Sequence, residues 1–122
     1  MALFSVYPGG KEQRMYVAIR SYRLTSDSVD EVLRRANEGF IPIIKEAPGF
    51  LAYYAVDGGS GTVASVSVFK DRAGAEESNR MAAEWVRENL QSLLPSSPET
   101  IAGEVGAHEL NLAELGLREV KE

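Results

Sequence analysis

The chain has 122 residues, no cysteine and one histidine, and its 18 acidic side chains outnumber 13 basic ones, which gives a net charge of −5. The length and the 44% apolar content are typical of one globular domain whose core needs neither disulfides nor a structural metal. The lack of cysteine excludes thiol catalysis, Fe–S clusters and zinc sites with cysteine ligands. Nucleic-acid affinity depends on a basic surface, so the acidic balance argues against a nucleic acid as partner.

The ends of the chain differ from its middle. No apolar run approaches the roughly 18 residues that cross a bilayer, and the apolar start at residues 2–6 is too short for a signal peptide. We therefore expect a cytoplasmic protein with no membrane partner. A Pro-Gly-Gly sequence and a polar run predict that residues 1–14 are an extension. The domain is expected over residues 15–110, and the apolar tail over 111–122 is expected to contribute to a dimer.

The first half of the domain reads as a strand followed by a helix. Residues 15–24 are rich in β-branched and aromatic side chains that alternate, which predicts a strand. Ser28 and Glu31 have the spacing of a capping box, which predicts a helix start. Apolar residues then recur every three or four positions. Because Pro42 has no amide hydrogen, we expect the helix to kink there and to continue to about Lys45.

The second half contains two strands and a long helix. A glycine-rich stretch over 57–61 predicts a hairpin loop between strands over 50–56 and 62–69. Asp71 is placed to cap a second helix that ends near Leu94.

A fourth strand, predicted over residues 99–110, completes the order β-α-β-β-α-β. This order is typical of the ferredoxin-like α+β fold, a four-stranded antiparallel sheet with both helices on one face. The other face is then left open. Alternation along the strands predicts that this open face holds Tyr16, Ala18, Arg20, Tyr22, Ala52, Tyr54, Ser65, Ser67, Glu104 and His108.

Three features of the sequence carry a resemblance over roughly residues 15–110. They are the run MYVAIR from Met15, the Pro-Gly-Phe corner at 48–50 before a tyrosine-bearing strand, and the strand end VFKD at 68–71 before a helix. With these features the chain resembles the dimeric α/β-barrel superfamily, and within it the antibiotic-biosynthesis-monooxygenase-like proteins. The resemblance implies a homodimer in which two sheets face each other to form a barrel. The family includes cofactor-independent oxygenases that act on polycyclic aromatic compounds, and haem-degrading enzymes.

The residues of the haem-degrading branch are not found at matching positions. That branch uses an Asn on the first strand with a Trp and a His nearby, but residues 15–24 contain no Asn. Trp85 falls on the second helix, where core packing is its plainest role. For His108, a place near solvent or at the dimer contact is favoured over catalysis, because it has no obvious partner. No metal-binding motif is present, so we expect neither a metal nor another cofactor.

The candidate ligand-binding residues share the predicted open face and combine aromatic rings with a few polar groups, which suits a small, flat, partly polar ligand. They are Arg20, Tyr22, Tyr54, Ser65, Ser67, Glu104 and His108. A structural alternative is that Arg20 and Glu104 pair with each other. No catalytic residue is assigned.

Two functions remain open. The first is a cofactor-independent oxygenase acting on a small aromatic or polyketide-like molecule, with the substrate supplying the electrons. The second is a non-catalytic dimer that binds a metabolite or a protein. In both, three tyrosines on the open face would form an aromatic patch that monomers rarely expose, which predicts a homodimer through the sheets. A charge placed at Ser67 is then expected to weaken the assembly.

Overall fold

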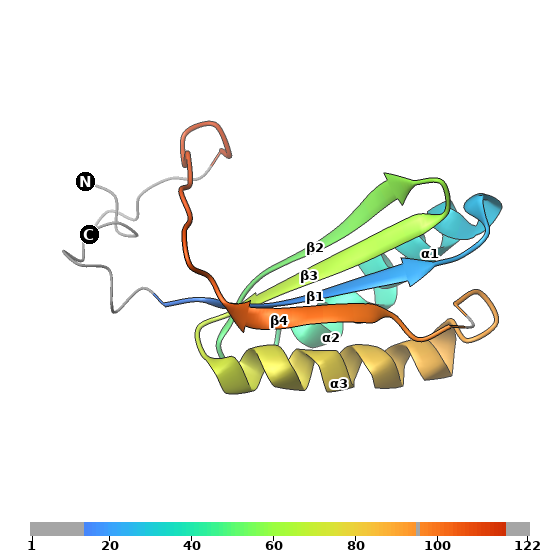
Figure 1. The fold of residues 1–122 in the computed structure, drawn as a ribbon, viewed down its shortest axis with the longest axis horizontal. Coiled ribbons are helices and arrows are strands. Elements are labelled where there is room, and N and C mark those ends of the chain that lie inside the picture. Colours follow the sequence, from blue (N-terminus) through green and yellow to red (C-terminus); the bar gives the residue numbers. More distant parts are fainter. Residues whose placement is uncertain (1–13, 95, 117–122) are drawn as a thin grey trace.

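The computed structural model describes residues 14–94 and 96–116, and its elements follow the predicted order (Figure 1). The strands are β1 (Tyr16–Arg23), β2 (Phe50–Gly59), β3 (Thr62–Phe69) and β4 (Glu99–Glu104). The helical segments are the short turn η3 (Ser26–Ser28), α1 (Val29–Arg35), the π-turn η4 (Ala36–Phe40), α2 (Ile41–Ile44) and α3 (Arg72–Asn89). No helix in the described part of the chain combines the length and the apolar character that a membrane crossing requires.

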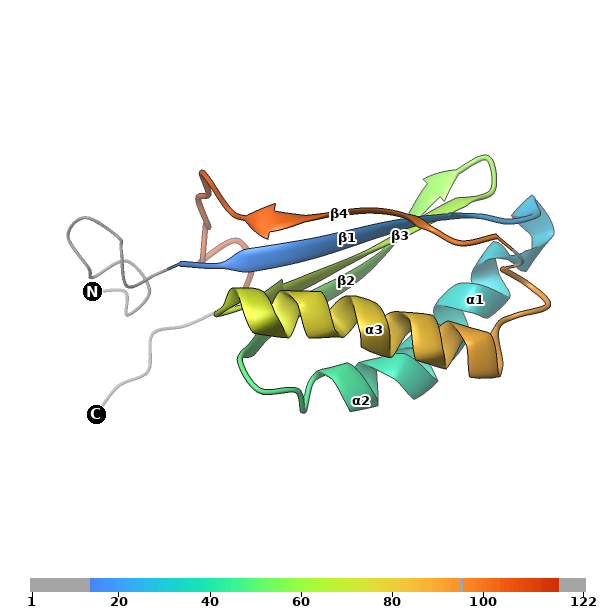
Figure 2. The ribbon, with the colours of Figure 1, turned by 60° about the horizontal axis from the view of Figure 1, so that its bottom comes forward.

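The strands form one antiparallel sheet in the order β2-β3-β1-β4. Figure 2 shows α1, α2 and α3 together on one side of this sheet, and no described helix covers the other side. This arrangement is the ferredoxin-like α+β fold. The predicted fold class is therefore confirmed.

The first helical stretch runs from Val29 to Ile44 and passes through Pro42, as predicted. The irregularity is a π-turn, in which the amide of Ile41 donates to the carbonyl of Ala36, five residues earlier. Pro42 then lies in the first turn of α2, where its missing amide hydrogen leaves no helical bond unmade. Thus one extra residue in the preceding turn lets the helix accommodate the proline.

The predicted capping box at the start of this helix is wrong. The side chain of Ser28 makes no capping hydrogen bond to the helix, and its hydroxyl lies 2.9 Å from Oγ1 of Thr25. Glu31 does not reach back to the helix start because its carboxylate accepts hydrogen bonds from Arg34 and Arg35. The second predicted cap is confirmed, since the amide of Gly74 donates to Oδ1 of Asp71 over 2.8 Å.

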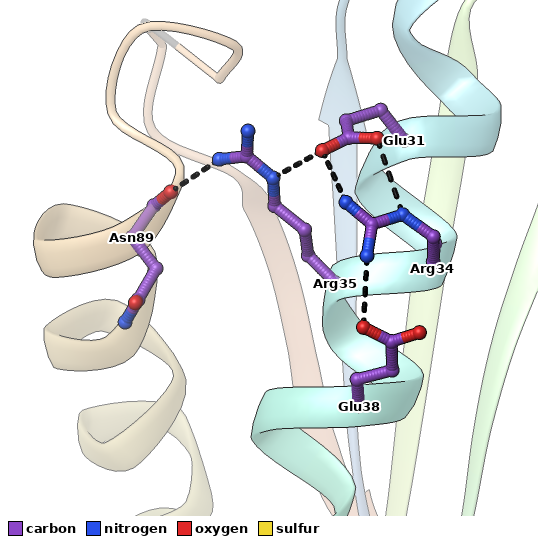
Figure 3. A network of polar contacts seen from close by, with 5 residues as sticks. All are labelled: Glu31, Arg34, Arg35, Glu38 and Asn89. Carbon is purple, nitrogen blue, oxygen red and sulfur yellow. Dashed lines mark hydrogen bonds and ion pairs between the residues drawn. The ribbon is translucent and has the colours of Figure 1, made fainter.

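Arg35 ties α1 to the end of α3 (Figure 3). Its Nε donates to Glu31 over 2.6 Å, and its Nη1 donates to the main-chain oxygen of Asn89, the last residue of α3, over 3.0 Å. A cation at that end of a helix is favourable because the unpaired carbonyls there carry partial negative charge. The hydrogen bonds from Arg34 and Arg35 lower the pKa of Glu31. These groups are exposed, so the network sets the position of α1 more than it adds stability.

The apolar core between sheet and helices is divided into two clusters. One contains Ala18 of β1, and the other contains Tyr22 of the same strand. Arg20 lies between them in sequence and on the same face of β1, and only 1% of its surface is exposed. Trp85 of α3 packs against both clusters. The core is thus interrupted by a buried cation.

The predicted assignment of the two strand faces is wrong. Arg20, Tyr22, Ser65 and Ser67 are buried beneath the helices. Tyr16 shares their side of β1, where the guanidinium of Arg72 at the start of α3 lies 5.3 Å from its ring centre. The helix-facing side of the sheet therefore holds the polar residues, because α3 and β3 supply their hydrogen-bond partners.

The open face is apolar, and its side chains form rows across all four strands. The central row is Tyr54, Val66, Ile19 and Ile101, in the order β2-β3-β1-β4. Exposure reaches 57% for Tyr54 and 69% for Ile101. Only Tyr54 and Ala52, of the residues predicted for this face, have the register that places them on it.

The fourth strand is shorter than predicted because β1 gives it no further partner. β1 begins at Tyr16, which pairs with Glu104, and the last bond joins the amide of Val105 to the carbonyl of Met15. Beyond it the chain leaves the end of the sheet (Figure 1), and His108 lies there, exposed. Residues 1–13 of the predicted extension and residues 117–122 of the predicted tail fall outside the described residues, whereas Arg14 is described.

Candidate functional site

Arg20 anchors a polar cluster between the sheet and α3. Its Nε donates to Oγ of Ser65 over 3.0 Å and its Nη2 to Oγ of Ser67 over 2.6 Å, both on β3. Its Nη1 donates to Oγ of Ser78 over 3.4 Å and to Oδ1 of Asn79 over 2.8 Å, both on α3. Four of the five guanidinium hydrogens are used, and every acceptor is neutral.

No ion pair in the described part of the chain includes Arg20. The proposed pairing with Glu104 is wrong, because the carboxylate of Glu104 lies 3.7 Å from Nε of Arg14 instead. Burial lowers the pKa of Arg20, but an arginine stays charged even so. A buried cation without an anion is costly, which makes Arg20 the most unusual polar residue of the structure.

A cavity of about 40 Å³ lies beside this cluster, between the sheet and the helices. Three of its lining residues carry hydroxyl groups, Tyr22, Tyr53 and Ser65, and we call these its polar end, because Ser65 bonds to Arg20 and both tyrosines lie near the charge of Arg20. The remaining wall is apolar and comes from α1, η4, α3 and the segment that follows α3. Its residues are Val32, Ala36, Phe40, Ala82, Trp85, Val86, Leu90 and Leu94.

The two tyrosines at the polar end stay protonated at neutral pH. Burial raises the pKa of both Tyr22 and Tyr53, while the nearby positive charge of Arg20 acts in the opposite direction. Since the ordinary pKa of tyrosine is about 10, a raised value leaves the hydroxyl hydrogen in place. Both groups are therefore hydrogen-bond donors, not bases, toward anything that enters the cavity.

Two open grooves flank the cavity, so movement of the side chains between them can open a space large enough for an aromatic ring. A cavity of 40 Å³ holds a few waters but no aromatic ring. Tyr22, Val86 and Leu94 separate it from a groove of about 280 Å³. Phe40 and Trp85, whose ring centres lie 5.6 Å apart, separate it from a second groove of about 260 Å³.

The structure brings together part of the predicted site. Arg20, Tyr22, Ser65 and Ser67 form one cluster, although on the helix-facing side of the sheet. Tyr54 lies on the opposite face, and Glu104 and His108 lie at and beyond the end of β4. Among the described residues, no three His, Asp or Glu side chains are grouped so that they could hold a metal.

Sequence reasoning missed Tyr53 and the cavity role of Trp85. Tyr53 is the neighbour of Tyr54, and a shift of one residue along a strand changes the face. The signal for the correct face was available in α3, where Ser78 and Asn79 interrupt an otherwise apolar helix side. A buried arginine needs such partners, so Ser65, Ser67, Ser78 and Asn79 together indicate where Arg20 points.

Gly39 in the π-turn sets the position of Trp85. A Cβ atom at position 39 would lie 2.9 Å from Cζ2 of Trp85, closer than such atoms approach. We expect Gly39→Ala to displace the indole, and therefore to change the emission of the single tryptophan and its quenching by acrylamide. Gly106→Ala is the control, because no atom lies within 4 Å of the added Cβ. Equal spectra for both variants would contradict this prediction.

Comparison with solved structures identifies the fold. The chain matches NE2512, a protein of unknown function from Nitrosomonas europaea, with a TM-score of 0.65 and 20% identity, over 82% of this chain and 97% of that one. It matches a monooxygenase from the gene ActVA-Orf6 of Streptomyces coelicolor, solved in complex with the ligand nanaomycin D, with a TM-score of 0.63 and 21% identity, over 79% of this chain and 91% of that one.

The likeness is one of fold. At such identities it confirms the predicted resemblance to monooxygenase-like ferredoxin-fold proteins for the architecture. A dimeric ferredoxin-like protein from an uncultured marine organism also matches, with a TM-score of 0.62 and 11% identity, over 82% of this chain and 95% of that one. No family model and no curated relative matches the sequence.

Proposed function

We propose that the protein is a cofactor-independent oxygenase whose substrate, a small aromatic molecule, binds in the cavity between the sheet and the helices. The observation that carries this proposal is the cavity's composition, with three hydroxyl groups beside a buried arginine at one end and aromatic and aliphatic walls elsewhere. Once side-chain movement joins the cavity to a flanking groove, such a site can hold a ring by its apolar body and orient it by one polar atom. The monooxygenase among the structural neighbours has the same fold and was solved in complex with the ligand nanaomycin D.

The chemistry that fits this site draws its electrons from the substrate. An aromatic ketone such as anthrone can lose a proton to solvent water to give an enolate, and the hydroxyl groups of Tyr22 and Tyr53 can donate hydrogen bonds to the enolate oxygen. Reaction with O₂ then places one oxygen atom on the carbon as a carbonyl, and the other leaves as water. Anthrone thereby becomes anthraquinone and supplies all four electrons, so no further reductant is required.

Oxygen uptake with anthrone tests this function. We expect the purified protein to consume one O₂ per anthrone, faster than protein-free buffer, with a chelator present and no flavin added. Tyr53→Phe should lower the rate at least tenfold, because a lost oxyanion donor typically costs a factor of about 100 or more. Tyr54→Phe is the matched control, since the same hydroxyl is removed on the opposite face.

Two outcomes would count against this proposal, one against the enzyme and one against the assigned site. If oxygen uptake equals that of buffer while anthrone still quenches the fluorescence of Trp85, the protein is the non-catalytic binding alternative. If Tyr53→Phe and Tyr54→Phe have equal rates well above buffer, oxidation occurs outside the cavity and the assigned site is wrong.

A second copy of the chain is the proposed partner. The open face carries a row of apolar side chains across four strands, and its exposed members include Tyr54, Val56 and Ile101. Burying apolar surface gains about 25 cal/mol per Å², and an identical sheet offers a matching apolar surface. Ser67 cannot test this dimer, because it is buried against Arg20 on the other face. The contribution of the tail stays a prediction; its described part includes exposed Leu115.

A further inference from the structure

The charge of Arg20 has no counterpart within the described protein. Its hydrogen bonds go to three serines and one asparagine, which satisfy the donors but leave the positive charge uncompensated. A purely structural explanation is that the cation connects β3 to α3. Neutral residues could make that tie without the cost of removing a charge from water, so the retained charge calls for a further role.

Ser65 connects this charge to the cavity. Its Oγ accepts the hydrogen bond from Nε of Arg20, and the same side chain lines the cavity. Tyr22 and Tyr53 line the same end and keep their hydroxyl hydrogens at neutral pH. The polar end of the cavity therefore presents O–H donors with a cation behind them, an environment that stabilises a negatively charged oxygen.

The adjoining groove has the same sign of charge. Arg87 is the only charged residue among the described residues that line the 280 Å³ groove next to Tyr22. The second groove, next to Trp85, has two acidic residues, Glu84 and Glu88, beside Arg80. In a chain with a net charge of −5, the approach on the Tyr22 side is the one that an anion can use.

We propose that the ligand of this cavity is an aromatic oxyanion, bound with its charged oxygen at the end formed by Tyr22, Tyr53 and Ser65, and that Arg20 compensates its charge. This inference rests on the proposed use of the cavity as a binding site and specifies the class of molecule. The aromatic body of the ligand lies among Phe40, Trp85 and the aliphatic wall. Movement of Val86 and Leu94, which also line the groove next to Tyr22, makes room for it.

A matched pair of probes tests the charge. 2-Naphthoate and 2-naphthamide have nearly the same shape, but only naphthoate is an anion at pH 7, and binding of each is followed by the fluorescence of Trp85. We expect the unaltered protein to bind naphthoate at least tenfold more tightly than naphthamide. Equal affinities would leave an aromatic-binding cavity and overturn the oxyanion assignment alone. If neither probe binds up to its solubility limit, the cavity is not a binding site and both proposals fail.

Two variants locate the origin of the preference. Ser67→Asp places a carboxylate beside Nη2 of Arg20, at a position that does not line the cavity, and so supplies the counter-charge from within. We expect it to reduce the preference for naphthoate to less than threefold while naphthamide binding changes little. Arg20→Gln should do the same by removing the charge. A preference that persists in folded samples of either variant, checked by circular dichroism, would assign it to another group and refute the role of Arg20.

Discussion

Replacing Val66 by aspartate is expected to convert the protein from a dimer into a monomer. Val66 lies in the central row of the open face, between Ile19 and Tyr54 on the neighbouring strands. If two such faces meet, the substitution buries two carboxylates near one another at the centre of the interface, where neither has a counter-charge. We expect the dissociation constant to rise at least a hundredfold, which corresponds to about 2.8 kcal/mol.

Light scattering over a range of protein concentrations measures this change. The unaltered chain should give about twice 13.3 kDa at micromolar concentration, and Val66→Asp should give 13.3 kDa. Asn37→Asp adds the same charge at an exposed position of the π-turn and should leave the dimer intact. Circular dichroism must show that Val66→Asp is folded. A folded variant that dimerises as tightly as the unaltered chain would place the interface elsewhere.

The order and type of the elements follow from the sequence because they depend on local patterns. Alternating β-branched residues predict β1 and β3, and the recurrence of apolar residues predicts the helices on either side of the β2–β3 hairpin. The register of the sheet and the length of β4 do not follow in this way. β4 ends at Glu104, which pairs with Tyr16, the first residue of β1. The length of β4 therefore depends on its partner strand and not on its own sequence alone.

The faces of the sheet were misassigned for a physical reason. Val17, Ile19, Val66 and Val68 lie on one face of the sheet, and in a monomer such aliphatic residues are expected against the helices. The aromatic and polar residues of the same strands are then expected on the open face. In the structure the helix-facing side contains Arg20, because side chains of α3 and β3 satisfy its donors. The aliphatic side is the one left open, as expected of a surface that a partner covers.

The candidate site could be predicted in its parts but not in its location. Arg20, Tyr22, Ser65 and Ser67 stand out as polar or aromatic residues within apolar strands, and the structure does bring them together. Their position beneath the helices depends on pairing across 45 to 59 residues of sequence, which no pattern within a single strand or helix encodes. Trp85 joins them from α3 for the same reason.

The substitution Ile44→Ala is expected to lower the free energy of unfolding by about 3 kcal/mol, within the range of about 2 to 5 kcal/mol for large-to-small changes in a core. Ile44 in α2 is fully buried and belongs to the cluster that includes Phe40 and Phe69. Removal of three carbon atoms there leaves a space that the surrounding side chains cannot fill completely. Denaturant unfolding at one fixed protein concentration measures the loss, since dimerisation adds to apparent stability.

Ile43→Ala is the matched control for this prediction. Ile43 precedes Ile44 in the same helix and follows Pro42 directly, but 47% of its surface is exposed, so we expect a loss below about 1 kcal/mol. Both substitutions change the helix propensity equally, and their difference therefore isolates burial. Phe40 shares the cluster of Ile44 and packs on Trp85, so Ile44→Ala should also increase the quenching of Trp85 by acrylamide. Equal losses for the two variants would mean that the helix turns a different side toward the sheet, and the cavity wall formed by Phe40 would have to be reassigned with it.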